Sequence, residues 1–222
     1  MQGPFSRAGE IFNYVEVGLW LAPLALVAFA TSLLAGRLSA RVPLRGAIAA
    51  GMALTAGGLI LMRGITPDSS WAHLLLGLAV TGAGTGLANP LVTFAHLGVL
   101  PPAQGGLASG INNTARQLGL AVGVAVLGAL LQGGIADRVA TDAGGLGESR
   151  AAVREQIQEG DIGAATALAP APAREQLRVT YDAAFADGLN ELLLIAAALA
   201  LVGLVAAVVL VRARDLWRPE EV

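Results

Sequence analysis

Residues 69–115 read SSWAHLLLGLAVTGAGTGLANPLVTFAHLGVLPPAQGGLASGINNTA and contain no Asp, Glu, Lys or Arg. A helix needs about 20 mostly apolar residues to cross the hydrocarbon core of a bilayer, so this stretch is too long for one crossing and suits two. Pro101 and Pro102 divide it, because proline cannot continue a helix and pushes the preceding residue toward extended geometry. The stretch therefore predicts two membrane-spanning helices, over residues 73–99 and 106–131.

Three further apolar stretches flank this pair of helices. Residues 17–36 and 46–62 precede it, and residues 192–211 follow it. Each is close to the length of one membrane crossing. We therefore expect an all-α fold class, a polytopic membrane bundle of five transmembrane helices. A soluble protein with a large buried core would need five separated stretches of this length by accident.

Composition supports a membrane protein and excludes several function classes. The chain has 222 residues, of which 55% are hydrophobic and only 14% are charged, whereas soluble domains carry about 25% charged residues. There is no cysteine, which excludes disulfides, thiolate metal sites and cysteine catalysis. The net charge of -2 and the absence of lysine argue against nucleic acid as a partner.

The two histidines give no sign of an enzyme. His73 and His96 are far apart in the sequence and no acid accompanies them, so we expect no catalytic residue, no metal site and no cofactor. A lone histidine within a membrane span is most often a hydrogen-bonded packing residue. His96 could alternatively titrate near neutral pH.

The expected domain organisation follows from the five spans. It comprises an N-terminal segment (1–16), four transmembrane helices (17–132), an external loop with short helices (133–187), a last transmembrane helix (188–214) and a cytoplasmic tail (215–222). In the loop, residues 148–158 have helical spacing, and residues 174 onward can run as a helix into the last span. The loop is either a solvated connector or a cap that binds a partner.

The distribution of arginine predicts the orientation. Residues 36–45 and the tail after residue 211 are rich in arginine and lie on the same side of a five-span chain, whereas the short loop on the opposite side has only Arg63. Positively charged loops face the cytoplasm. We therefore expect a multi-pass protein of the cell (inner) membrane, with the lipid bilayer as its surroundings, a cytoplasmic C-terminus and an external loop at 133–187.

Polar side chains interrupt the fourth span at helical spacing. They are Ser109, Asn112, Asn113, Arg116 and Gln117. Arg116 would lie about 15 Å inside a helix that enters the membrane near residue 106, where arginine costs at least about 2.5 kcal/mol. A helix beginning only after Arg116 would rise about 20 Å, too little to cross. These residues either line a substrate path or pair with an acid, or they form a structural hydrogen-bond cluster from which Arg116 reaches the cytoplasmic face.

Small residues recur four apart in two spans. Gly82 and Gly86 do so in the third span, and residues 106–110 and 119–123 begin and end with glycine in the fourth. Such spacing favours close helix packing in lipid. Smooth contacts of this kind could also let helices rock during alternating access. Pro90 should kink the third span.

The loop at residues 36–45, GRLSARVPLR, resembles the Gly-x-Leu-x-Asp-Arg-x-Gly-Arg-Arg loop of the major facilitator superfamily in its weaker second copy. The matching positions are Gly36, Leu38, Arg41 and Arg45. Ala40 and Pro43 stand where that loop has its acid and its second glycine, so the gating salt bridge of the family lacks its acid here. The resemblance makes these residues gating-loop candidates: Gly36, Arg37, Arg41 and Arg45.

Residues 105–128, GGLASGINNTARQLGLAVGVAVLG, are similar to the penultimate helix of the fourteen-helix drug:proton antiporters, and AFADGL at 184–189 is similar to the same group. The resemblance covers about residues 17–132 and 180–214, the last five helices of such a transporter. It implies the C-terminal part of a proton-coupled efflux transporter for small amphipathic compounds or drugs, with that substrate and protons as partners.

In that group the proton-carrying carboxylates lie mainly in an N-terminal half, which the resemblance does not cover. The chain thus looks like a fragment or the product of a truncated reading frame. The alternative function is a truncated, non-transporting membrane protein, or a scaffold that needs a partner half.

Overall fold

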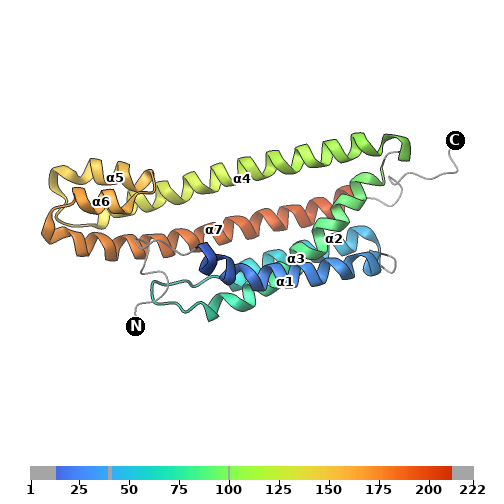
Figure 1. Cartoon of the computed structure of the whole chain (residues 1–222), viewed down its shortest axis with the longest axis horizontal. Coiled ribbons are helices and arrows are strands. Elements are labelled where there is room, and N and C mark those ends of the chain that lie inside the picture. Colours follow the sequence, from blue (N-terminus) through green and yellow to red (C-terminus); the bar gives the residue numbers. More distant parts are fainter. Residues whose placement is uncertain (1–13, 40–41, 100, 212–222) are drawn as a thin grey trace. The chain divides into compact units, whose positions relative to one another are not determined.

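The computed structural model describes residues 14–39, 42–99 and 101–211, and every regular element in these ranges is helical (Figure 1). The helices long and apolar enough to cross a membrane are α1 (Tyr14–Ser39), α2 (Leu44–Leu61), α3 (Ala72–Leu97), α4 (Gly105–Asp142) and α7 (Arg174–Leu210). Short helices α5 (Arg150–Gln158) and α6 (Ile162–Leu168) lie between α4 and α7 in the sequence. Three 3-10 turns cover Pro102–Gln104, Gly147–Ser149 and Ala171–Ala173. The expected all-α bundle with five membrane-length helices is confirmed.

The expected break in the uncharged stretch is present. α3 ends at Leu97 and α4 begins at Gly105, with a 3-10 turn between them at the paired prolines. α4 continues well beyond the predicted end at residue 131, because its last turns place Ile135 and Val139 in a buried core. These turns are helical through packing on short helices, which a hydropathy pattern alone does not reveal.

The described residues form two compact units, each with its own core. One unit comprises residues 63–71 and 122–193, and the other comprises residues 14–62, 72–121 and 194–211. The second unit holds α1, α2 and α3, and its core is made of small and aliphatic side chains. Members of that core are Ala35, Ala47, Ile48, Leu91 and Ala207.

Glycines of α3 bring its backbone against two neighbouring helices. A Cβ atom added at Gly82 or Gly86 would overlap the backbone of α1, at Leu24 and Ala28 respectively. A Cβ atom added at Gly84 would overlap α2. Small residues permit this close approach, which is a main source of helix association in lipid. The expected close packing is therefore confirmed for α3.

Residues 133–187, called the helical cap below, fold around an apolar core. Its largest fully buried side chains are Ile135, Val139, Leu146, Val153, Ile157 and Leu177. Gly160, with φ +85°, makes the turn between α5 and α6. Asp161 directly precedes α6 as its N-cap residue, and its side chain accepts a hydrogen bond from the N–H of Ala164 at 2.8 Å. The helix expected over residues 148–158 is present as α5, and the helix expected from residue 174 into the last span is present as α7. The sequence did not predict α6.

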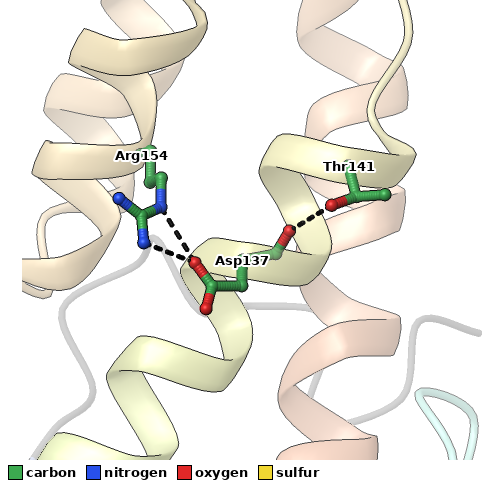
Figure 2. Close-up of polar contacts among 3 residues, drawn as sticks. All are labelled: Asp137, Thr141 and Arg154. Carbon is green, nitrogen blue, oxygen red and sulfur yellow. Dashed lines mark hydrogen bonds and ion pairs between the residues drawn. The ribbon is translucent and has the colours of Figure 1, made fainter.

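Adjacent charged residues of α4 hold two different elements of the cap. Arg154 of α5 donates from Nε and Nη2 to one oxygen of Asp137, over 2.9 and 2.6 Å (Figure 2). The Thr141 hydroxyl donates to the backbone carbonyl of Asp137 over 2.8 Å. The next residue, Arg138, donates to Asp187 of α7 over 2.5 Å. These ion pairs thus tie α4 to α5 and to α7 within the cap.

Candidate functional site

The polar residues predicted as a stripe all lie inside α4. The 3-10 turn at residues 102–104 leads directly into the helix at Gly105. Arg116 therefore lies about 16 Å along the helix axis from Gly105, at 1.5 Å per residue. A helix that begins only after Arg116 is excluded.

The structure brings these residues together in two hydrogen-bonded pairs. Arg116 Nη2 donates to Asn113 Oδ1 over 3.2 Å. Asn112 Oδ1 lies 2.6 Å from His96 Nδ1, which joins the last turn of α3 to α4. Ser109 is exposed on the same side of the helix as the Arg116 pair. His96 is thus hydrogen-bonded, although the sequence did not predict its partner. The sequence signal that could have found this pair is that His96 and Asn112 are polar residues on either side of the short connection between α3 and α4.

The stripe lies on an exposed surface of the chain. Its side chains are exposed at positions 109, 113, 116 and 117, and half-buried at Asn112. Arg116 is bonded to a neutral amide. In the described part of the chain, the ion pairs are Arg138–Asp187 and Arg154–Asp137, both in the cap. The guanidinium of Arg116 is therefore not neutralised by a carboxylate within ranges 14–39, 42–99 and 101–211.

Glycines of α4 differ from those of α3. A Cβ atom added at Gly106, Gly110, Gly119 or Gly123 would meet nothing within 4 Å. Among the described residues the expected close packing is absent at these four glycines, which form two pairs on different sides of α4. Small residues four apart show that another helix can pack closely against this one, but they do not show which helix does so.

The gating-loop candidates lie at the junction of α1 and α2. Gly36 and Arg37 are exposed in the last turns of α1, and Arg45 is exposed in the first turn of α2. Arg41 lies outside the described residues. The short connection between Ser39 and Leu44 keeps the described candidates near one end of the two helices. Their role in gating stays a prediction.

Metal chemistry finds no support in the described ranges. No group of three or more His, Cys, Asp or Glu side chains there could hold a metal ion. The hydrogen-bonded partners in the stripe are the amides of Asn113 and Asn112, of which Asn113 contacts Arg116 and Asn112 contacts the His96 imidazole. Such groups can recognise a polar part of a ligand by hydrogen bonds.

Comparison with known proteins identifies the family. The family model of the Major Facilitator Superfamily matches residues 5–136. The multidrug efflux pump LfrA of Mycolicibacterium smegmatis is 29% identical over 187 residues, which are 84% of this chain and 37% of that protein. The cephamycin export protein CmcT of Amycolatopsis lactamdurans is 40% identical over 119 residues, 52% of this chain and 24% of that protein.

The multidrug resistance protein Stp of Mycobacterium tuberculosis is 32% identical over 114 residues, 51% of this chain and 21% of that protein. The chain thus spans between about a fifth and two fifths of the length of these relatives. No solved structure matches the chain. Because the family model covers more than half of the sequence, and because five helices have the length and apolar character of membrane spans, the chain is a multi-pass membrane protein that belongs to the Major Facilitator Superfamily, a family of transporters.

Proposed function

We propose that the chain forms the C-terminal helices of a proton-coupled efflux transporter for small amphipathic compounds, with α4 lining the substrate path. Relatives that match the chain carry the names multidrug efflux pump, multidrug resistance protein and cephamycin export protein. These names support export of organic molecules as the activity. The chain would supply this activity together with an N-terminal half.

The exposed guanidinium of Arg116 is the observation that carries this proposal. An arginine this deep in a membrane helix is costly if it faces lipid, so it should face protein or water. Its hydrogen bond to Asn113 uses one of the five N–H donors of the guanidinium. The remaining donors would be satisfied by water in a substrate path or by polar groups of the N-terminal half.

Proton coupling would require acids from outside this part of the chain. Asp68, in the loop after α2, is the one acid between residues 17 and 136. The five-residue stripe on α4 can form hydrogen bonds but contains no carboxylate to carry a proton. We therefore assign substrate contact to the stripe and proton transfer to the N-terminal half.

The proposed setting is the cell membrane, with the C-terminus in the cytoplasm and the helical cap outside. The basis is the arginine content of residues 36–45 and of the tail. In this orientation Arg37 and Arg45 lie at the cytoplasmic ends of α1 and α2. They would act as part of a loop that controls opening on that side.

Dye efflux in membrane vesicles tests the proposal. Vesicles would contain the chain together with an N-terminal half, the chain alone, or neither, under an imposed pH gradient and with a fluorescent cationic dye. We expect dye movement that a protonophore abolishes, in vesicles containing both halves. If vesicles containing both halves move no more dye than vesicles containing neither, the result contradicts transport and favours the non-transporting membrane protein.

A further inference from the structure

A partly open cavity of about 370 Å³ lies at the surface of the unit that holds α1, α2 and α3. The first half of α2 contributes Ile48 and Met52 to its wall, and the end of α3 contributes Val92 and His96. The end of α7 contributes Ala207 and Leu210. The volume falls in the range of small-molecule sites, which are mostly apolar with a few polar groups that orient the ligand.

His96 is the polar side chain of this cavity wall among the described residues. Its Nδ1 lies 2.6 Å from Oδ1 of Asn112. An amide oxygen can only accept a hydrogen bond, so Nδ1 donates it, and in the neutral form of the ring Nδ1 carries the single proton. The other ring nitrogen, Nε2, is then a hydrogen-bond acceptor.

We propose that this cavity binds a small amphipathic molecule whose head group donates a hydrogen bond to His96 Nε2. The ligand class is a primary alcohol or amine on an apolar chain of about ten carbons, within the size that such a cavity holds. The apolar chain would lie against Ile48, Met52 and Val92, and the head group at the imidazole. An acceptor-only head group would leave the lone pair of Nε2 without a partner.

This site is separate from the proposed substrate path. Its walls come from α2, α3 and α7, whereas the path is assigned to the exposed stripe of α4. Asn112 connects the two only by orienting His96. A chain that transports nothing would still bind the ligand, so failure of the dye-efflux experiment and failure of the experiment below have different meanings.

Methionine methyl groups give a direct readout of binding. Met52 lines the cavity, whereas Met62, at the other end of α2, is buried against α3 at Gly77. The full chain, labelled with ¹³C at its methionine methyl groups and placed in lipid nanodiscs, would be titrated with 1-decanol. We expect a saturable shift of the Met52 resonance and no shift of the Met62 resonance.

An isomeric ether isolates the hydrogen bond. Methyl nonyl ether has the same atoms as 1-decanol but cannot donate a hydrogen bond, and we expect it to bind about five-fold more weakly. The variant H96F keeps a ring of similar size and removes the acceptor. It should reduce the affinity for 1-decanol to that for the ether.

A filled cavity provides the steric control. A Cβ atom at Gly203 would lie 3.3 Å from the sulfur of Met52, so the larger side chain of G203L should occupy the cavity and abolish the shift. The same substitution at Gly123, where a Cβ atom would meet nothing within 4 Å, should leave binding unchanged. Equal affinity for alcohol and ether in the unmodified chain would overturn the proposal, whether or not either cavity variant folds. A linear, unsaturable shift of both methionines would overturn it as well.

Discussion

Asn190 and Ile65 exchange two hydrogen bonds: the N–H of Ile65 donates to Asn190 Oδ1 over 3.0 Å, and Asn190 Nδ2 donates to the Ile65 carbonyl over 2.8 Å. The N–H of Gly64 donates to the same side-chain oxygen over 2.9 Å. Gly64 has φ +85°, a left-handed conformation that favours glycine. One side chain of α7 thus satisfies three backbone groups of a turn that is distant in the sequence.

Replacing Asn190 by leucine should release this turn. The two N–H groups and the carbonyl would lose their partners, and the free energy of unfolding should fall by about 1–3 kcal/mol. Amide hydrogen exchange at Gly64 and Ile65 should become faster. E191Q, at the exposed neighbouring position, is the matched control and should change neither quantity. Unchanged exchange rates in N190L would show that the turn holds without the side chain.

Replacing Arg116 by glutamine should impair transport without preventing membrane insertion. The variant keeps a polar side chain but removes the charge and the donor geometry of the guanidinium. We expect about ten-fold slower dye efflux from vesicles containing both halves, as for loss of one charge-assisted hydrogen bond. R178Q in the cap, a change of the same type at an exposed position, should leave efflux unchanged. Equal efflux rates in R116Q and the unmodified protein would contradict a role for Arg116 in the path.

Single cysteines should report the orientation, since the chain has none of its own. E159C, at the exposed end of α5, should react with a membrane-impermeant maleimide added to intact cells. V42C, exposed just before α2, should react only after the membrane is permeabilised. Glu159 is preferable to Gly160, whose φ of +85° would strain a cysteine. The opposite labelling pattern would require an inverted orientation.

Glycine-to-alanine changes in α3 and α4 should alter stability in opposite directions. In G86A the new Cβ would overlap Ala28 of α1, so the free energy of unfolding should fall by about 1–3 kcal/mol. In G119A the new methyl group meets nothing within 4 Å, and its better helix propensity should raise the free energy of unfolding by about 0.5–1 kcal/mol. Denaturation in detergent micelles measures both. A change of the same sign in the two variants would contradict the packing described here.

The cap should depend on its core far more than on its ion pairs. Leu177 is fully buried, and L177A should lower the free energy of unfolding of the cap by about 2–5 kcal/mol. D137N removes the charge that pairs with Arg154. Because the side chain of Asp137 is 63% exposed and that of Arg154 is 47% exposed, the free energy of unfolding should fall by less than about 1 kcal/mol. Urea denaturation, followed by the fluorescence of a label on the cap, measures the free energy of unfolding of both variants. A larger loss in D137N than in L177A would reverse this ranking.

Helix positions in the membrane could be predicted from the sequence because span length and hydropathy are physical requirements of the bilayer. The paired prolines at 101–102 divide α3 from α4 as expected. The extension of α4 to Asp142 was not predicted, because its polar positions resemble a loop until Ile135 and Val139 have a core to enter. That core extends to Ala184, 49 positions after Ile135 in the sequence.

The candidate site was predictable in part. Helical spacing placed the polar residues of α4 near one another, and the pair formed by Arg116 and Asn113 is a direct result of that spacing. The bond between His96 and Asn112 depends on how two helices cross, which single-helix periodicity does not contain. The open surroundings of the α4 glycines were missed for the same reason.

The order of the charges at Asp137 and Arg138 favours one register of α4 relative to α5 and α7 in the cap. A shift of α4 by one residue would either bring Arg138 toward Arg154 and Val139 toward Asp187, or bring Asp137 toward Asp187 and Ala136 toward Arg154. In both cases one attractive pair becomes repulsive and the other is lost. Although each exposed pair adds little stability, a shifted register loses both attractions and gains one repulsion. The order of these two residues therefore favours one register of α4 against α5 and α7, and exchanging Asp137 and Arg138 should favour a shifted register.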